Sequence, residues 1–262
     1  MPGRIVTLTT DFGTTDHFAG TMKGVILTIA PAAQIVDITH DVRPFDVLDG
    51  GFTIAEASRY FPKKTIHAVV VDPGVGSTRR PLLAEAGGQY FVAPDNGVLS
   101  MILARGPAKV RHITNQRYFL KPLSRTFHGR DVFSPVAAHL AAGVLASRFG
   151  PRIDDYVRLD FGKPARGGKG QWTGSILKID RFGNIITNFH VGEFSELETR
   201  AFELRIGPAR VTRLALTFTE CANGELFAIV GSSGYLEVAM NQGSAAERLG
   251  CGAGAPVALS IG

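Results

Sequence analysis

The chain has 262 residues, of which 45% are hydrophobic, so it can bury a full core and lacks the composition of a disordered protein. Its two cysteines, Cys221 and Cys251, stand in unrelated contexts, which excludes a disulfide framework or C-x-x-C pair and favours a reducing compartment. The formal net charge is +5, but the basic residues between 105 and 130 are not interleaved with aromatic side chains, so we expect a solvated face and no nucleic-acid site.

The first residues lead directly into a strand-like run at residues 5–10, with no apolar segment followed by a small-residue cleavage site. The longest apolar helical patterns, at residues 18–30 and 136–146, are shorter than the roughly 20 residues that cross a bilayer. We therefore expect a cytoplasmic protein without a membrane partner.

Strand-like and helix-like segments alternate over about the first 160 residues. Strand patterns rich in β-branched or aromatic residues occur at residues 5–10, 34–38, 66–71 and 90–93. Helical patterns occur at residues 16–29 and 45–60, Asp95 can cap a helix that runs to Ala104, and another helix begins near Val132. This alternation predicts an α/β domain over residues 1–164, with a mainly parallel sheet covered by helices.

The pattern changes at a glycine-rich stretch, residues 165–170, which we interpret as a linker. Beyond it, short alternating runs recur at residues 174–179, 184–189, 201–206, 214–218, 226–230, 235–239 and 256–261. One short helix is expected at residues 245–249. Residues 171–262 therefore predict a smaller, β-rich, barrel-like domain.

Two aspartates follow strand-like runs in the first domain. Asp11 follows the run at residues 5–10, and Asp72 follows the apolar run at residues 66–71. Because open α/β sheets bind ligands at the carboxyl ends of their strands, the two carboxylates are candidates for one shared crevice. Aspartates before glycine or proline also cap turns, so these residues alone leave a structural role equally open.

Asp72 opens the motif Asp72-Pro-Gly-Val-Gly-Ser-Thr-Arg79, whose glycines let the backbone approach a ligand. The motif is not a dinucleotide fingerprint, because the third glycine is absent, and it lacks the Gly-Lys-Ser/Thr of a P-loop. An arginine close to Asp72 keeps the carboxylate ionised, which suits positioning or charge stabilisation.

The motif Phe127-His128-Gly129-Arg130-Asp131 lies just before the helix expected near Val132. A lone histidine is more often structural than functional. The adjacent glycine and the charged residues around His128 shift the interpretation towards a functional site.

Two loops of the second domain are candidates for ligand contacts. Asp180-Arg-Phe-Gly-Asn184 is a tight turn flanked by two hydrogen-bonding side chains, and Gly231-Ser-Ser-Gly-Tyr235 can present backbone amides to a ligand. Each alone is also typical of a hairpin turn. Histidine spacings such as H-x-x-x-H, H-E-x-x-H and H-x-H are absent, so we predict no metal site.

Taken together, seven motifs resemble those of the S-adenosyl-L-methionine (SAM) hydroxide adenosyltransferases, which are relatives of the SAM-dependent fluorinase and chlorinase. In chain order they are Thr-Thr-Asp11-Phe-Gly-Thr-Thr-Asp16, Pro44-Phe45-Asp46-Val47, Val-Val-Asp72-Pro-Gly-Val-Gly-Ser-Thr-Arg79, Ala93-Pro94-Asp95-Asn96-Gly97, Phe127-His128-Gly129-Arg130-Asp131, Asp180-Arg-Phe-Gly-Asn184 and Gly231-Ser-Ser-Gly-Tyr235. The resemblance runs from about residue 5 to the C-terminus and is specific as a set.

The resemblance implies hydrolysis of SAM at the ribose 5′ carbon to adenosine and L-methionine, with SAM as the substrate and no cofactor. Asp72, Arg79 and His128 match the family's Asp-Arg-His set. In this scheme Asp72 orients or deprotonates the water, while Arg79 and His128 fix the carboxylate and stabilise hydroxide character. Which of the three accepts the proton stays open.

The resemblance also implies roles in substrate binding. Asp11 is expected to hold the ribose hydroxyls, Phe45 to pack along the ribose or adenine, and Asp16 and Asp180 to face the methionine ammonium group. 

In the second domain, Asn184 is expected to pair with the adenine edge, and Ser232 and Ser233 to lie near the methionine moiety or the adenosine. The fluorinase pattern has an arginine after the first serine. Ser233 cannot grip the methionine carboxylate as that arginine can, so this contact stays open.

The halide-using relatives lack the pair formed by Asp72 and Arg79, and a buried carboxylate repels a halide anion, which favours water as the nucleophile. The family further implies a homotrimer with each site between two subunits. Three alternatives stay open: a metal-dependent hydrolase using Asp11, Asp72 and His128 as ligands, a SAM-dependent halogenase, and a non-catalytic protein that binds SAM or adenosine.

Overall fold

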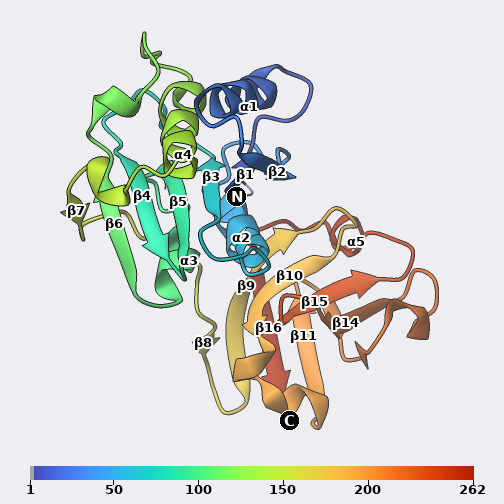
Figure 1. Ribbon diagram of the computed structural model, residues 1–262. Coiled ribbons are helices and arrows are strands. Elements are labelled where there is room, and N and C mark those ends of the chain that lie inside the picture. Colours follow the sequence, from blue (N-terminus) through green and yellow to red (C-terminus); the bar gives the residue numbers. More distant parts are fainter. Residues whose placement is uncertain (1–2) are drawn as a thin grey trace. The chain divides into compact units, whose positions relative to one another are not determined.

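A computed structural model describes residues 3–262 and divides the chain into two compact units, one up to Leu159 and one from Asp160 to Gly262 (Figure 1). The strands of the first unit are β1 (Ile5–Thr10), β2 (Gln34–Thr39), β3 (Ile66–Val70), β4 (Pro81–Ala86), β5 (Gln89–Pro94), β6 (Ala108–His112) and β7 (Arg152–Ile153). Its α-helices are α1 (Phe18–Ile29), α2 (Val47–Ser58), α3 (Ser100–Ala104) and α4 (Ser134–Ala141).

The first unit is built on a seven-stranded sheet in the order β2-β1-β3-β5-β4-β6-β7. Neighbouring strands are parallel from β2 to β5, and the pairs from β5 to β7 are antiparallel. The prediction of an α/β fold with a sheet covered by helices is confirmed, and the sheet is mixed, with three parallel and three antiparallel pairs.

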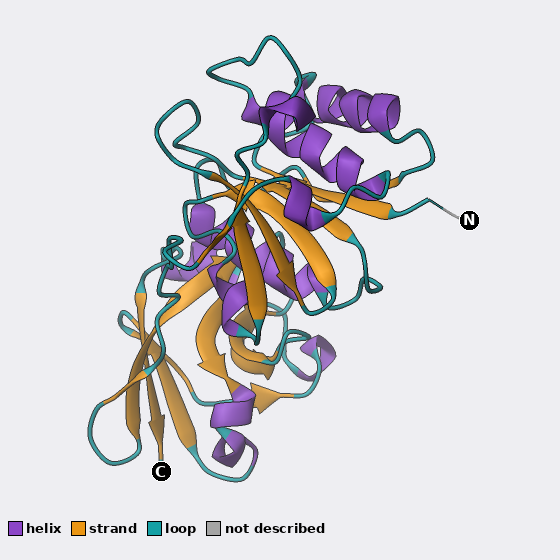
Figure 2. Cartoon of the chain, turned by 60° about the vertical axis from the view of Figure 1, so that its left-hand side comes forward, coloured by secondary structure: helices purple, strands orange, loops and turns teal. Residues whose placement is uncertain are grey.

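Helices cover both faces of this sheet, as Figure 2 shows. On one face, α1 and α4 pack on inward side chains such as Leu8 and Val70. On the other face, α2 and α3 pack on Val69 and Phe91. Side chains that alternate between two covered faces make a central strand largely apolar, which explains why every residue of β3 is buried and His67 is its one polar residue.

Local signals account for some element boundaries and fail at others. Asp46 caps α2, where its carboxylate accepts a hydrogen bond from the Asp49 amide at 2.9 Å. The prediction that Asp95 caps a helix is wrong: α3 begins at Ser100 without a side-chain cap. Asp95 makes tertiary contacts instead: its carboxylate accepts hydrogen bonds from the Arg80 side chain and from the Val157 amide, at 2.8 Å each.

Strand β4 has no counterpart among the predicted elements. Gly87 and Gly88 join it to β5 and have φ of 58° and 82°. Two consecutive residues with positive φ form the tight hairpin turn that glycine favours. This Gly-Gly pair is therefore the signal in the sequence that identifies the hairpin.

The second unit is a nine-stranded sheet of mostly antiparallel strands. Its strands are β8 (Ala165–Arg166), β9 (Gln171–Ile179), β10 (Ile185–His190), β11 (Phe202–Ile206), β12 (Ala209–Val211), β13 (Leu214–Ala215), β14 (Leu226–Val230), β15 (Tyr235–Met240) and β16 (Pro256–Ile261). The sheet curls around a main apolar core, against which helix α5 (Ala245–Leu249) packs, and a smaller apolar cluster includes Phe227 and Ala239 (Figure 1). The expected smaller, β-rich, barrel-like fold is confirmed.

Two details of the second unit differ from the sequence pattern. The strand expected at residues 214–218 is only β13, and a 3-10 helix follows at Phe218–Glu220. Residues 165–170, predicted as a linker, contain β8, which pairs with β9 at Trp172 and Thr173.

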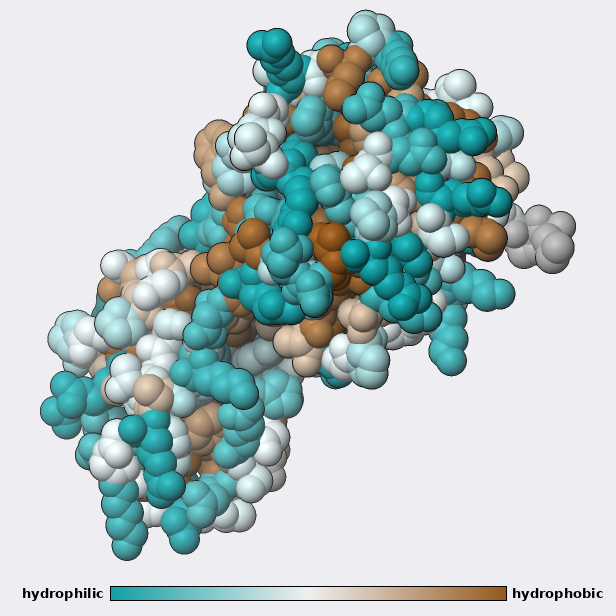
Figure 3. Space-filling view, turned by 90° about the vertical axis from the view of Figure 1, so that its left-hand side faces the viewer, coloured by the Kyte–Doolittle hydropathy of each residue, from teal (hydrophilic) through white to brown (hydrophobic). Residues whose placement is uncertain are grey.

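No helix within residues 3–262 is long and apolar enough to cross a membrane. On the face drawn in Figure 3, hydrophilic side chains surround small groups of apolar ones. Isolated apolar residues on a surface are ordinary in proteins and need no partner to explain them.

Candidate active site

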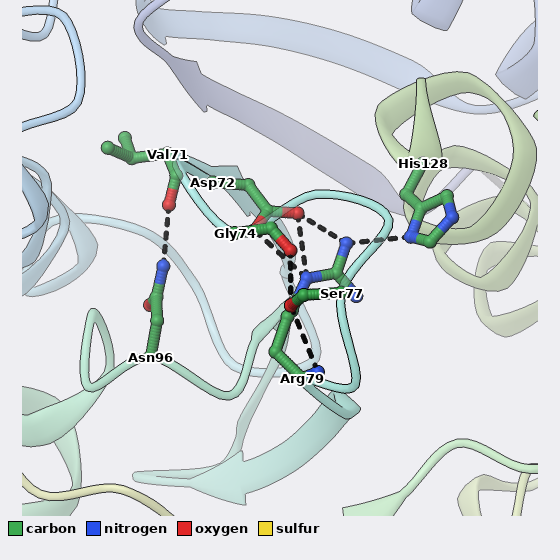
Figure 4. Close-up of polar contacts among 7 residues, drawn as sticks. All are labelled: Val71, Asp72, Gly74, Ser77, Arg79, Asn96 and His128. Carbon is green, nitrogen blue, oxygen red and sulfur yellow. Dashed lines mark hydrogen bonds and ion pairs between the residues drawn. The ribbon is translucent and has the colours of Figure 1, made fainter. Parts of the chain in front are cut away.

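The loop between β3 and β4 crosses the carboxyl end of β5, because β5 lies between those two strands in the sheet. Asn96, just after β5, donates its side-chain amide to the Val71 carbonyl at 2.8 Å, before the loop begins. At the other end, Arg80 donates to Asp95. The turn after β5 therefore fixes both ends of the loop, and Figure 4 shows the bond from Asn96 to Val71.

Within this loop, Asp72 and Arg79 form a nearly buried ion pair. The Nε atom of Arg79 lies 2.9 Å from both carboxylate oxygens, and Nη2 donates to Oδ2 as well. The side chains are 5% and 9% exposed, and the guanidinium carbon lies 5.3 Å from the centre of the Phe133 ring. Burial reduces solvent screening, so the pair holds a fixed carboxylate at the end of β3.

His128 extends this pair into a chain of three side chains (Figure 4). Its Nδ1 lies 2.7 Å from Arg79 Nη2. A guanidinium only donates hydrogen bonds, so Nδ1 accepts, and the ring proton of the neutral histidine lies on Nε2. Burial, and after it the charge of Arg79, lower the pKa of His128, which favours this neutral form.

The segment before α4 explains why His128 faces Arg79. His128 precedes a π-helical turn at Gly129–Phe133, and a Cβ atom on Gly129 would lie only 3.2 Å from Met22 Sδ. The buried Asp131 accepts from the Ser124 amide at 2.7 Å. A close helix contact and a buried carboxylate therefore fix the conformation on both sides of His128.

Asp11 follows β1, which pairs in parallel with β3, so Asp11 and Asp72 follow the ends of neighbouring strands. Burial raises the pKa of Asp11, and the charge of Asp72 raises it further. Its Oδ2 accepts a hydrogen bond from the Phe45 amide at 2.9 Å. Phe45 has φ of 66° and a side chain that is 74% exposed, so a strained backbone presents an unpacked aromatic ring beside this carboxylate.

Asp180 and Asn184 in the second unit bind each other. The Asp180 carboxylate accepts from the Phe182 and Asn184 amides at 2.8 and 2.9 Å, and from the Asn184 side-chain amide at 2.8 Å. The side-chain oxygen of Asn184 is left to accept from a ligand. These hydrogen bonds show that Asp180 and Asn184 stabilise their own turn, whether or not they also bind a ligand.

The remaining candidates lie on loops. Asp16 is exposed just before α1. Ser232 and Ser233 form the tip between β14 and β15, which the Gly234 amide closes by donating to the Gly231 carbonyl at 2.9 Å. The structure therefore brings Asp11, Asp72, Arg79 and His128 together in the first unit, and Asp180 and Asn184 in the second.

Glu237, on β15, is absent from the candidates that the sequence motifs suggest. It is 9% exposed, and burial together with the charge of Asp180 raises its pKa to about 7. In the sequence it occupies one polar position in an alternating strand, which is typical of a solvated face. The one signal in the sequence is its place six residues after Gly231, where the Gly231-Ser-Ser-Gly loop begins.

Within residues 3–262, no three or more histidine, cysteine, aspartate or glutamate side chains form a group suited to a metal ion. 

Comparison with known families gives two matches that together span most of the chain. The SAM hydroxide adenosyltransferase N-terminal domain matches residues 6–150, and the C-terminal domain of the same family matches residues 174–258. 

Individual relatives cover nearly the whole chain. An (R)-S-adenosyl-L-methionine hydrolase from Salinispora tropica is 36% identical over 98% of both chains. A fluorinase from Nocardia brasiliensis is 28% identical over 98% of this chain and 97% of its own. A crystal structure of an uncharacterized conserved protein from Thermotoga maritima is 38% identical and has a TM-score of 0.90, covering 98% of this chain and 99% of that one.

Proposed function

Because the chain belongs to the SAM hydroxide adenosyltransferase family, we propose that it hydrolyses S-adenosyl-L-methionine at the ribose 5′ carbon, giving adenosine and L-methionine. The observation that carries this proposal is the hydrogen-bonded chain of Asp72, Arg79 and His128 at the carboxyl edge of the sheet. 

In the proposed reaction, the Asp72 carboxylate orients a water molecule and takes its proton. A bond forms between the water oxygen and the 5′ carbon, the bond from that carbon to sulfur breaks, and its electron pair goes to sulfur. Arg79 holds the Asp72 carboxylate in place, and neutral His128 accepts a hydrogen bond from the guanidinium through Nδ1.

Burial favours this chemistry. A hydroxide-like nucleophile and a sulfonium disappear together as the thioether leaves, so charge is annihilated in the transition state. The near-complete burial of Asp72 and Arg79 keeps bulk water from stabilising the separated charges of the ground state. The same negative carboxylate opposes a halide as nucleophile.

Substrate binding draws on residues of both units. In the first unit, Asp11 binds the ribose hydroxyls, the exposed ring of Phe45 packs on the ribose or adenine, and Asp16 faces the methionine ammonium group. The strained backbone and the exposed ring of Phe45 support this role, since a bound ligand would cover the ring.

In the second unit, Asp180 also faces the ammonium group, and Asn184 accepts from the adenine amino group through its unused oxygen. Ser232 and Ser233 contact the methionine moiety or the adenosine. We further propose a cytoplasmic protein, supported by the two unpaired cysteines, that takes SAM as substrate and uses no metal or other cofactor.

A homotrimer with each site shared between two subunits is part of the proposal, as the resemblance to the family implies. Co-expression of Asp72→Asn with Asn184→Ala tests it. If one subunit supplies the first unit and its neighbour the second, random mixing leaves about a quarter of the sites intact, so activity returns. No recovered activity in the mixed assembly contradicts shared sites.

The proposed activity is tested by incubating the protein with SAM and separating the products. We expect adenosine and methionine, also in the presence of chloride or fluoride. Halogenated adenosine would show a halogenase, and intact SAM a binding protein. Asp72→Asn should lower turnover about a hundredfold to ten-thousandfold with little change in KM, whereas the exposed control Asp154→Asn should not. Unchanged turnover in Asp72→Asn would contradict the assigned role.

A further inference from the structure

Glu237 is a largely buried residue, 9% exposed as a whole. No hydrogen bond or ion pair joins it to any side chain or backbone group that the structure describes. Its chain neighbours Leu236 and Val238 point into the core of the second unit, so Glu237 lies on the opposite face of β15. Burying an ionised carboxylate without a partner is unfavourable, so such a group either takes up a proton or gains a cationic ligand.

The position of this carboxylate is fixed closely. Across the sheet, Glu237 pairs with Ile186 on β10 and with Ile229 on β14, and both are apolar and buried. A Cβ atom built on Gly231 would lie 1.7 Å from Glu237 Oε1. The carboxylate therefore lies directly against the backbone of the Gly231–Gly234 loop, in space that exists because residue 231 is glycine.

A second carboxylate lies nearby on the turn between β9 and β10. Asp180 raises the pKa of Glu237 and is the charged group of the described chain that acts on it. Lys178 on β9 shares its register with Ile186 and so lies two strands away, and the His190 ring on β10 contacts Tyr235. Asp180 follows β9 two residues after Lys178, which shares a register row with Glu237 through Ile186, so both carboxyl groups lie on this part of the sheet, Glu237 against the Gly231–Gly234 loop.

We propose that Glu237, together with Asp180, binds the α-ammonium group of the methionine moiety of the substrate. An ammonium group has three N–H donors and can bond both carboxylates at once. The other cation of the substrate, the sulfonium, has no N–H and would leave the Glu237 oxygens unbonded. This inference rests on the proposed function and adds to it a residue that sets specificity for the amino acid end of the substrate.

The proposal predicts competition between protons and substrate. Glu237 binds the ammonium group only when it is ionised, so KM for SAM should rise as the pH falls below about 7, while kcat follows the groups around Asp72. Glu237→Gln keeps the shape of the side chain and removes its charge. It should raise KM about tenfold to a hundredfold, leave kcat within about threefold, and flatten the dependence of KM on pH.

A matched pair of ligands separates ammonium binding from general damage. The second ligand is the SAM analogue with a butanoate chain in place of 2-aminobutanoate, used as a competitive inhibitor. Its Ki should be the same in the wild type and Glu237→Gln, whereas KM for SAM rises. Glu203→Gln, on the surface of the same unit, is the control and should change neither value.

Each outcome has one meaning. If the wild type releases no adenosine from SAM, the proposed function fails. If it does, but Glu237→Gln changes KM and Ki equally or changes neither, the inference alone is wrong. A variant that loses its assembly state assigns Glu237 to a subunit contact and also overturns the inference. If Glu237→Gln does not fold, Glu237→Asp, which keeps the charge but shortens its reach, must show the same separation of KM from Ki.

Discussion

Replacing Glu237 by glutamine should stabilise the ligand-free protein by an amount that depends on pH. Burial, and after it the charge of Asp180, raise the pKa of Glu237 from 4.5 to about 7 in the folded chain. The folded state therefore holds this proton more tightly than the unfolded state does. The stability that the proton contributes is fully present below pH 4.5 and is lost as the pH rises through about 7.

The size of the effect follows from these two pKa values. They differ by about two and a half pH units, and each unit is worth about 1.4 kcal/mol. The free energy of unfolding that the proton contributes is therefore reduced by about 3 kcal/mol in the alkaline range. Glutamine does not titrate. Relative to the wild type, Glu237→Gln should therefore gain about 3 kcal/mol from acid to alkaline pH, or roughly 6 to 12 °C in melting temperature for a chain of this size.

Thermal unfolding of the full chain without ligand, at about pH 5, 6.5 and 8.5, measures this gain. Glu203→Gln is the control, because Glu203 faces Arg210 at 3.6 Å on the surface and should give no comparable trend. A difference between Glu237→Gln and the wild type that is the same at all three pH values would refute the reasoning.

Three further predictions follow from the site. Gly231→Ala places a Cβ atom where Glu237 Oε1 lies, so it should displace the carboxylate and raise KM as Glu237→Gln does; steady-state kinetics with unchanged KM would argue against this. NMR titration should give His128 a pKa below 6.5, and Arg79→Gln should raise that pKa because it removes a nearby positive charge; a fall would contradict the pairing. A chelator should leave adenosine formation unchanged, and loss of activity that zinc or manganese restores would refute metal-free chemistry.

Much of the fold is predictable because its strands and helices have strong periodic patterns. The central strand β3 and helix α2 occur within a residue or two of the expected segments, since burial of one face governs both. The errors lie where tertiary contacts overrule local signals. Asp95 stands at a position where the sequence predicts a helix cap, yet its carboxylate accepts hydrogen bonds from Arg80 and the Val157 amide.

The candidate site was predictable only as separate pieces. Asp72 and Arg79 are seven residues apart in one loop, so their proximity follows from the motif. His128 lies 49 residues beyond Arg79, and no spacing rule brings the two together; the packing before α4 does so. Glu237 was missed because alternation in β15 indicates a polar face, while the burial of that face depends on neighbouring strands.

The loop from Asp72 to Arg79 is clamped at its two ends by a single turn, through Asn96 on one side and Asp95 on the other. A segment anchored in this way can change its interior without losing its place on the sheet. This loop can therefore be exchanged as one segment in protein engineering. Transplanting the corresponding stretch from a fluorinase relative, with both anchors kept, would reveal whether the choice of nucleophile travels with one loop or is spread over the surrounding residues.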